Sequence, residues 1–209
     1  MNRFPALAVL MAVALTACRH PEGTGSIQPE VSGRVLSCEP GHRLAPRVAA
    51  PVGPDALTGV RAQFVAISRT VVGGFAGLRN RPGQMAILLA DTSRAADVRA
   101  ALLEIVRSDQ RALPSTADLV ARAPAIQVKW TLAELYDWLW HLEGALVPTL
   151  QTFGGAYTSS GVDDAANRVF FDAQDSSTHA GLLRALESLS LPCELVTSQV
   201  RPISIGDGW

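Results

Sequence analysis

Charged side chains are scarce in this chain, and its basic residues never form a run. Of the 209 residues, 18% are charged and 48% are hydrophobic, and the formal net charge is −1. A near-neutral chain offers no positive field to a nucleic-acid backbone, so no nucleic-acid partner is expected. No apolar stretch reaches the roughly 18 to 20 residues that a spanning helix needs, which excludes a polytopic membrane protein. The hydrophobic content suffices for one sizeable core or two small ones.

Cysteine is scarcer still than charged residues. The chain contains Cys18, Cys38 and Cys193, and no two of them form a CxxC pair. This spacing excludes a dithiol redox motif and a cysteine-rich zinc site. His20 and His42 have no partners at metal-ligand spacing, and we interpret both as solvated loop residues. No metal site and no cofactor are therefore expected.

The N-terminal residues predict export. Arg3 provides a short positive region, residues 4–15 are almost wholly apolar, and Thr16 and Ala17 are small. This pattern is typical of a secretory signal peptide, and it is too short for a stable transmembrane anchor. We therefore expect the rest of the chain to lie beyond the inner membrane.

The four residues LTAC, 15–18, resemble the lipobox of bacterial lipoproteins. The resemblance implies that residues 1–17 are a lipoprotein signal peptide and that Cys18 becomes acylated. Two or more acyl chains hold a protein firmly on a membrane. Arg19 stands where an aspartate would favour the inner membrane, so we expect attachment to the outer membrane, facing the periplasm. The alternative is an ordinary signal peptide in which Cys18 is incidental.

Residues 18–54 are rich in proline and glycine and show no sustained helical or strand period. This composition predicts a tether between the membrane and a folded domain. Cys38 lies in the tether, and Cys193 opens a predicted strand 155 residues further on. In an oxidising compartment such a pair favours a disulfide, which would dock the stretch VSGRVLSC on the domain and stabilise it by roughly 4 to 5 kcal/mol. The alternative is one buried and one exposed free thiol.

Residues 55–202 alternate between helix and strand patterns. The predicted order is a helix at 55–71, a hairpin at 75–91, a helix at 93–109, a strand at 125–130, a helix at 131–150, a hairpin at 155–173, a helix at 177–189 and a strand at 193–200. Strand, strand, helix and strand thus occur twice. We predict an α+β fold of two such small layers, joined by the long helix 131–150 and preceded by an N-terminal helix. Residues 203–209 are expected to form a C-terminal tail.

Capping residues mark the starts of the predicted helices. Asp55 and Ser93 are expected to cap the helices 55–71 and 93–109. Thr131 and Glu134 form a capping box at the start of the long helix. The buried face of the first helix is expected to comprise Leu57, Val60, Phe64, Ile67 and Val71, and that of the long helix Leu132, Leu135, Leu139, Leu142 and Leu146.

Three stretches carry a family resemblance: QFVAISRTVVGGFAGLRN, the helix beginning TLAELYDW, and GVDDAANRVFF. They look like the N-terminal region that precedes chymotrypsin-like domains in some secreted bacterial proteins. More distantly, the two-fold layout of residues 55–202 resembles the pro-regions of α-lytic protease and streptogrisins. The resemblance implies a domain that binds a protease, helps it fold and can inhibit it. Because no protease domain follows VRPISIGDGW in this sequence, the implied role is in trans.

The polar residues do not predict catalysis. Asp137 precedes His141 by one turn, which favours an exposed helix pair over a catalytic dyad. Ser159, Ser160 and Ser176 lack the glycines of a nucleophile elbow, and His179 lies within a predicted helix. Asp163 and Asp164 are adjacent in VDDAAN, a pattern typical of a hairpin turn. We therefore expect a protein that is not an enzyme.

Aromatic side chains are the best candidates for binding. Trp130, Tyr136, Trp138 and Trp140 cluster around the start of the long helix. Trp138 and Trp140 lie about 200° apart on a helix, so one of them is a candidate interface residue. The alternative is that both pack between the two layers.

These observations predict a membrane-anchored, non-enzymatic envelope lipoprotein with a protein- or peptide-binding domain. The alternative function is a trans-acting inhibitor or folding helper of a chymotrypsin-like protease.

Overall fold

The computed structural model describes residues 32–33, 38–47, 57–71, 73–81, 84–109 and 113–202. The predicted signal peptide, Cys18 and the tail 203–209 lie outside these residues. The helices are α1 (Gly59–Ala66), α2 (Ala95–Ser108), α3 (Pro114–Arg122), α4 (Leu132–Phe153) and α5 (Ser176–Glu187). The strands are β1 (Ser32–Gly33), β2 (Phe75–Arg81), β3 (Gln84–Leu89), β4 (Ala125–Gln127), β5 (Ser159–Asp163), β6 (Arg168–Ala173) and β7 (Val196–Val200). The fold is α+β, as predicted.

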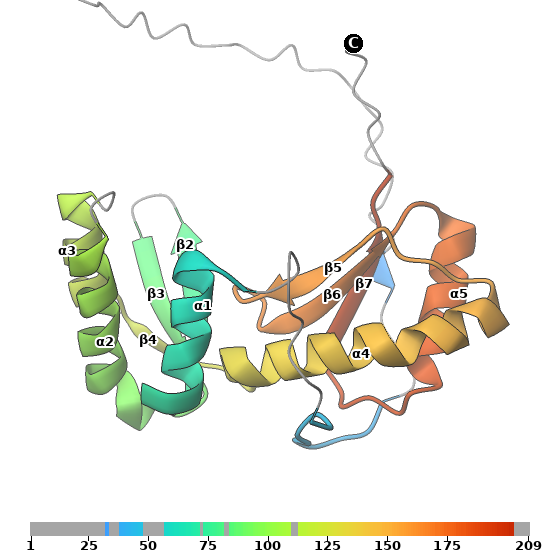
Figure 1. Ribbon diagram of the computed structural model, residues 1–209, viewed down its shortest axis with the longest axis horizontal. Helices are drawn as coiled ribbons and strands as arrows, with labels where there is room; N and C mark the ends of the chain where they lie inside the picture. The colour runs from blue at the N-terminus through green and yellow to red at the C-terminus, as the bar shows by residue number, and fades with distance from the viewer. Residues whose placement is uncertain are drawn as a thin grey trace, which may run out of the picture.

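The strands form two separate sheets, one in each lobe of the molecule (Figure 1). The first lobe holds a three-stranded sheet in the order β2-β3-β4, in which β2 and β3 are antiparallel and β4 is parallel to β3. The second lobe holds a four-stranded sheet in the order β1-β7-β6-β5, and β7 is parallel to β6. Each parallel pair is connected through helices, as parallel strands require. The predicted repeat of strand, strand, helix and strand is confirmed, with α3 added before β4.

Helix α4 connects the two lobes (Figure 1). Its predicted capping box is confirmed, because the Thr131 hydroxyl accepts from the Glu134 amide and the Glu134 carboxylate accepts from the Thr131 amide. Each such bond satisfies an amide that the first turn leaves without a helical partner. The predicted leucine face is buried: Leu132, Leu135, Leu139, Leu142 and Leu146 are at most 6% exposed. They join a single hydrophobic cluster that reaches into both lobes.

The two long helices of the second lobe pack with unusually close backbones. An added Cβ on Gly181 of α5 would lie 2.5 Å from the Cα of Gly155, which follows α4. Only glycine permits this approach at either position.

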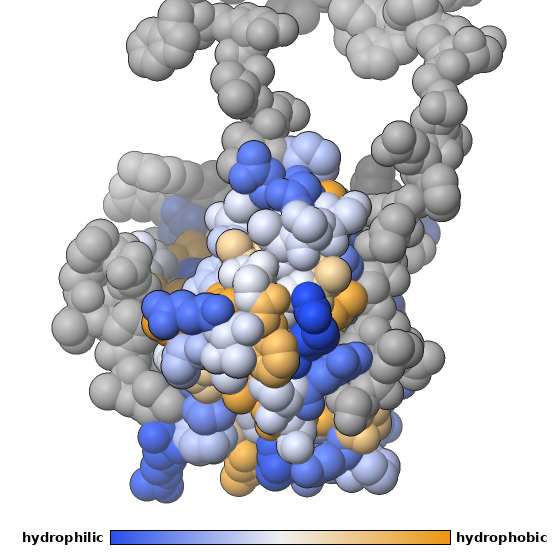
Figure 2. Space-filling view, turned by 90° about the vertical axis from the view of Figure 1, so that its right-hand side faces the viewer, coloured by the Kyte–Doolittle hydropathy of each residue, from blue (hydrophilic) through white to orange (hydrophobic). Residues whose placement is uncertain are grey.

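The surface at the end of the molecule where α5 lies is mixed in character. There, hydrophobic side chains of the described residues appear in scattered spots among hydrophilic ones (Figure 2).

The hairpin between β5 and β6 carries its turn into contact with the first lobe. Asp163 accepts a hydrogen bond from the Ala166 amide, which is the turn chemistry predicted for VDDAAN. Asp164 forms an ion pair with Arg61 of α1 at 3.0 Å. Asn167 has a φ of 57° and bonds to the backbone ahead of α4. The turn therefore holds the lobes together as well as reversing the chain.

Two predicted helix starts are wrong by a few residues. Helix α1 begins at Gly59 with Thr58 at its N-cap, whereas the predicted cap, Asp55, lies outside the described residues. Val60 is 43% exposed rather than buried. The cap ahead of α2 is Asp91, which accepts from the Ser93 amide and starts the 3-10 turn Thr92–Arg94. Ahead of α2 a residue near the predicted cap satisfies a first amide, whereas Thr58 makes no side-chain capping bond at the start of α1.

Two strands are shorter than predicted, and one helix was not predicted. The strand expected at 125–130 ends at Gln127. The last strand begins at Val196, so Cys193 lies in the turn before it. Helix α3 has nine residues and begins with Pro114, a good first residue for a helix. Its segment is too short to show a sustained helical period, which explains the omission.

Candidate functional site: a hollow beside Trp140

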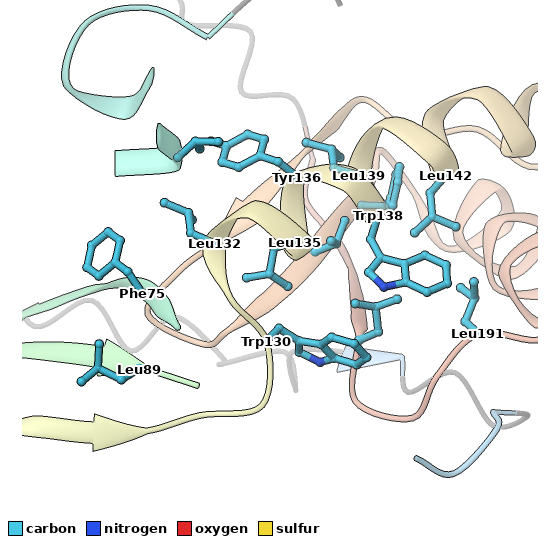
Figure 3. Packing of buried hydrophobic residues seen from close by; sticks show 14 of the residues in the cluster. Phe75, Leu89, Trp130, Leu132, Leu135, Tyr136, Trp138, Leu139, Leu142 and Leu191 are labelled. Atoms are coloured by element: carbon cyan, nitrogen blue, oxygen red, sulfur yellow. The ribbon is translucent and has the colours of Figure 1, made fainter. Parts of the chain in front are cut away.

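The two tryptophans of α4 have different environments. Trp138 is fully buried and points toward Trp130 and Leu191 (Figure 3). Trp140 is only partly buried. It shares its side of the helix with Tyr136, and the centroids of the two rings lie 5.8 Å apart. Trp140 also packs against the core cluster, as the alternative has it, but it keeps part of its surface exposed, unlike Trp138. The prediction that one of them is partly exposed holds in this structure.

Residues 38–47, which we name the strap, lie across the start of α4. The predicted tether includes them, yet they pack on the domain. The sulfur atoms of Cys38 and Cys193 are at disulfide distance, with Cα atoms 4.9 Å apart. Next to them the Glu39 amide donates to the Leu191 carbonyl, and the Cys193 amide donates to the Glu39 carbonyl, both at 2.9 Å. The predicted cysteine pair thus joins the strap to the turn before β7.

The strap covers two buried indoles. The His42 ring stacks on Trp130 with centroids 4.6 Å apart, and its Nε2 lies 3.1 Å from a carboxylate oxygen of Glu134. His42 lies outside any helix or strand and its side chain is 44% exposed, as predicted for a solvated loop residue, while one face of its ring rests on Trp130. Trp138 donates from Nε1 to the carbonyl of Arg43, whose guanidinium lies 5.5 Å from the centroid of the same ring. Cationic groups over an indole face are attracted by its quadrupole.

A π-helical turn, Ile67–Val71, follows α1 and forms the opposite side of the site. Such turns often occur at functional positions. Ser68, its second residue, is 6% exposed and connects two elements. Its hydroxyl donates to the Phe75 carbonyl and accepts from the Ala133 amide, at 2.8 and 2.9 Å. This pair of bonds fixes the π turn against the start of α4.

The π turn places Arg69 beside Trp140. The Arg69 guanidinium lies 5.9 Å from the centroid of the Trp140 ring and forms an ion pair with Asp137. Asp137 therefore pairs with Arg69 and not with His141, contrary to the predicted helix pair. His141 instead packs edge-on against Trp138. Burial, with a smaller contribution from the Arg43 charge, lowers the pKa of His141 below its usual value.

The strap, the π turn and α4 enclose a hollow of about 550 Å³, which we name the Trp140 hollow. Its lining residues are Leu44, Ala45, Arg47, Arg69, Glu134, Asp137 and Trp140. Glu134 and Asp137 are paired with His42 and Arg69, whereas Arg47 makes no ion pair with any described residue. The hollow therefore offers one partly exposed indole next to one available guanidinium. Tryptophan and arginine are the residues most enriched at protein-binding surfaces.

The other polar residues singled out from the sequence lie elsewhere. Ser160 donates to Glu143, and Ser159 donates to the buried carboxylate of Asp172 in the second lobe. Ser177 and Thr178 donate from their amides to Asp175, so the segment containing Ser176 is a helix start. His179 is 4% exposed and faces the interior. The fold brings none of them to the Trp140 hollow.

Within the described ranges, no group of three side chains is placed to hold a metal ion. No described helix is long and apolar enough to cross a bilayer.

Ser68 and Arg69 were not predicted as site residues. Both residues fall within the predicted helix 55–71, whose amphipathic pattern continues through them. Nothing in the local sequence therefore marks them as residues of a binding site. The strap was also missed as a wall of the site, since its contacts with α4 span about ninety residues of sequence.

No family model, no curated protein and no solved structure matches this chain. The resemblance to pro-regions and the lipobox therefore stay predictions from the residues themselves.

Proposed function

We propose that this protein is a non-enzymatic lipoprotein of the bacterial cell envelope that binds a protein or peptide through the Trp140 hollow. Cys18 is the acylated residue, and the outer membrane, on its periplasmic side, is the site of attachment. The observation that carries the binding role is the partly exposed Trp140 ring between the strap and the π turn.

Export is supported by the cysteine pair. A disulfide between Cys38 and Cys193 persists in an oxidising compartment and is rare in the cytosol. The N-terminal signal pattern points to the same compartment. Two independent features, one local and one depending on the fold, therefore favour a protein that works outside the cytosol.

The chemistry of the hollow favours a peptide segment with an apolar side chain and a nearby acidic group. The indole supplies a rigid apolar surface, and its burial by a partner removes water at little cost in side-chain entropy. Arg47 supplies a guanidinium that can pair bidentately with a carboxylate. Arg69 is held by Asp137, so it contributes to the shape of the wall more than to charge.

Anchoring is tested by labelling cells with radioactive palmitate and fractionating their envelopes. Wild type is expected to be labelled and to require detergent for release, whereas Cys18→Ala is unlabelled and is released without detergent. Equal labelling and equal solubility of both proteins would reject the anchoring.

Binding is tested with a photoreactive amino acid placed at position 140 of the anchored protein in living cells. Position 151 is the matched control, because Gln151 is exposed on the same helix. We expect a discrete crosslinked species from position 140 only, and Arg47→Glu should weaken it. Equal yields from the two positions, or none from position 140, would reject the hollow as the binding site.

A further inference from the structure

A separate cavity of about 640 Å³ opens on the three-stranded sheet of the first lobe. Strand register places Arg79 opposite Ala86, and Leu88 beside Ile126, so these side chains share one face. The C-terminal end of α3, with Leu119 and Arg122, completes the wall. The Trp140 hollow shares no lining residue with this cavity.

The lining of the cavity combines apolar groups with two arginines. Ala86, Leu119, Pro124 and Ile126 contribute apolar surface, and no acidic residue lines the cavity. In the described part of the chain, neither Arg79 nor Arg122 forms an ion pair. Two positive charges therefore stand at an apolar surface without a protein counter-charge.

Both guanidinium groups are held in place by backbone carbonyls. Arg79 donates from Nε and from one terminal nitrogen to the carbonyl of Ala165, at 3.2 and 2.8 Å. Arg122 donates from Nε to the carbonyl of Asp118 at 3.2 Å. These bonds use two or fewer of the five N–H groups on each side chain, so donors remain for a ligand. A positioned arginine loses less freedom when it binds an anion than a mobile one does.

We propose that this cavity binds an anionic amphiphile, with its headgroup between Arg79 and Arg122 and its hydrocarbon chain over Ala86, Leu119 and Ile126. Its volume lies within the range of small-ligand sites, which are mostly apolar with a few polar groups that fix orientation. A carboxylate or phosphate head supplies the missing counter-charge and accepts charge-assisted hydrogen bonds. A cationic head would add to the unpaired positive charge, so the sign of the ligand follows from the lining.

The test uses the full chain in a neutral detergent and a decanoate that carries a diazirine at mid-chain. After irradiation, labelled tryptic peptides are mapped by mass spectrometry. We expect labels in the peptides that contain Ala86, Leu119 and Ile126. Decanoate and decyl phosphate should compete with the probe, and their relative strength identifies the preferred headgroup. Decanol and decylamine should compete at least about tenfold less, the value of one charge-assisted hydrogen bond.

Arg122→Gln is the main variant, because Arg122 is exposed and bonds only within its own helix. It should weaken labelling by decanoate about tenfold, while Arg107→Gln on α2 should leave labelling unchanged. Arg107 is also exposed and pairs with Glu104, away from the cavity. Melting temperatures of both variants show whether folding is preserved.

Three results would overturn the proposal: labels outside these peptides, equal competition by decylamine and decanoate, or equal labelling of the two arginine variants. Because the probe and the variants lie outside the Trp140 hollow, each of these results leaves the proposed peptide binding unaffected.

Discussion

The side-chain amide of Asn167 closes over the backbone of Trp130. Its Oδ1 accepts from the Trp130 amide at 2.8 Å and from the Lys129 amide at 3.1 Å, while its Nδ2 donates to the Trp130 carbonyl at 2.7 Å. Asn167 is 6% exposed and belongs to the hairpin turn of the second lobe. Trp130 belongs to the connection from the first lobe to α4. One side chain therefore fixes the path of the chain between the lobes.

Replacing Asn167 with alanine should lower the free energy of unfolding by about 2 to 4 kcal/mol. The change leaves two buried backbone groups of Trp130 and the part-buried Lys129 amide without this partner, and each buried group costs about 1 kcal/mol or more. Chemical denaturation measures the loss. Asn167→Gly is the matched control, because glycine removes the same bonds but tolerates the positive φ of this position. A glycine variant as stable as wild type would show that the φ, and not the bonds, decides stability here.

Replacing Gly181 with alanine should lower the free energy of unfolding by about 1 to 3 kcal/mol. The new Cβ would lie 2.5 Å from Gly155, and backbone cannot give way as a flexible side chain can. Gly144→Ala is the control, since nothing lies within 4 Å of its added Cβ and the position is inside α4. There alanine should stabilise by about 0.5 to 1 kcal/mol. Thermal melts that show equal shifts for the two variants would contradict the close helix contact.

Reducing the Cys38–Cys193 bond should expose Lys129, the only lysine of the chain. Its Nζ donates to the Cys193 carbonyl at 3.1 Å and lies 5.2 Å from the centroid of Trp130, which the strap covers. Once the strap is free, an amine-reactive ester should modify Lys129 several-fold faster, as mass spectrometry can follow. Cys38→Ser should react at the faster rate with or without reductant. Identical rates for oxidised and reduced wild type would show that the strap stays bound without its disulfide.

The Asp175 carboxylate should make stability depend on pH at low pH. Hydrogen bonds from the Thr178 amide and the Ser177 hydroxyl lower the pKa of Asp175 below its usual 3.8. A pKa that is lower in the folded state contributes stability above the unfolded pKa, and this stability is lost as the pH falls through the folded pKa. Asp175→Asn keeps a capping side chain but has no charge to lose. The free energy of unfolding, measured from pH 6 to pH 2, should therefore fall less steeply for the variant than for wild type. Parallel curves for the two proteins would contradict the assignment.

Elements with long, regular patterns were predictable from the sequence. The leucine spacing and the Thr131–Glu134 box located α4, and the turn residues of VDDAAN located the second hairpin. These signals are local, because capping bonds and helix faces involve residues three or four positions apart. The nine-residue helix α3 and the three-residue strand β4 were missed or misjudged in length, since so short a segment does not show a period.

The sequence by itself determined the class of fold and the order of its larger elements, and it favoured the pairing of the two cysteines after Cys18, which the structure places at disulfide distance. Only the tertiary structure decided which tryptophan keeps part of its surface exposed, because Trp138 and Trp140 differ in what packs against opposite sides of one helix. It also decided that the strap belongs to the domain, that Arg69 pairs with Asp137, and that Arg79 and Arg122 share a cavity. Those contacts join residues far apart in the chain, and no local pattern specifies them.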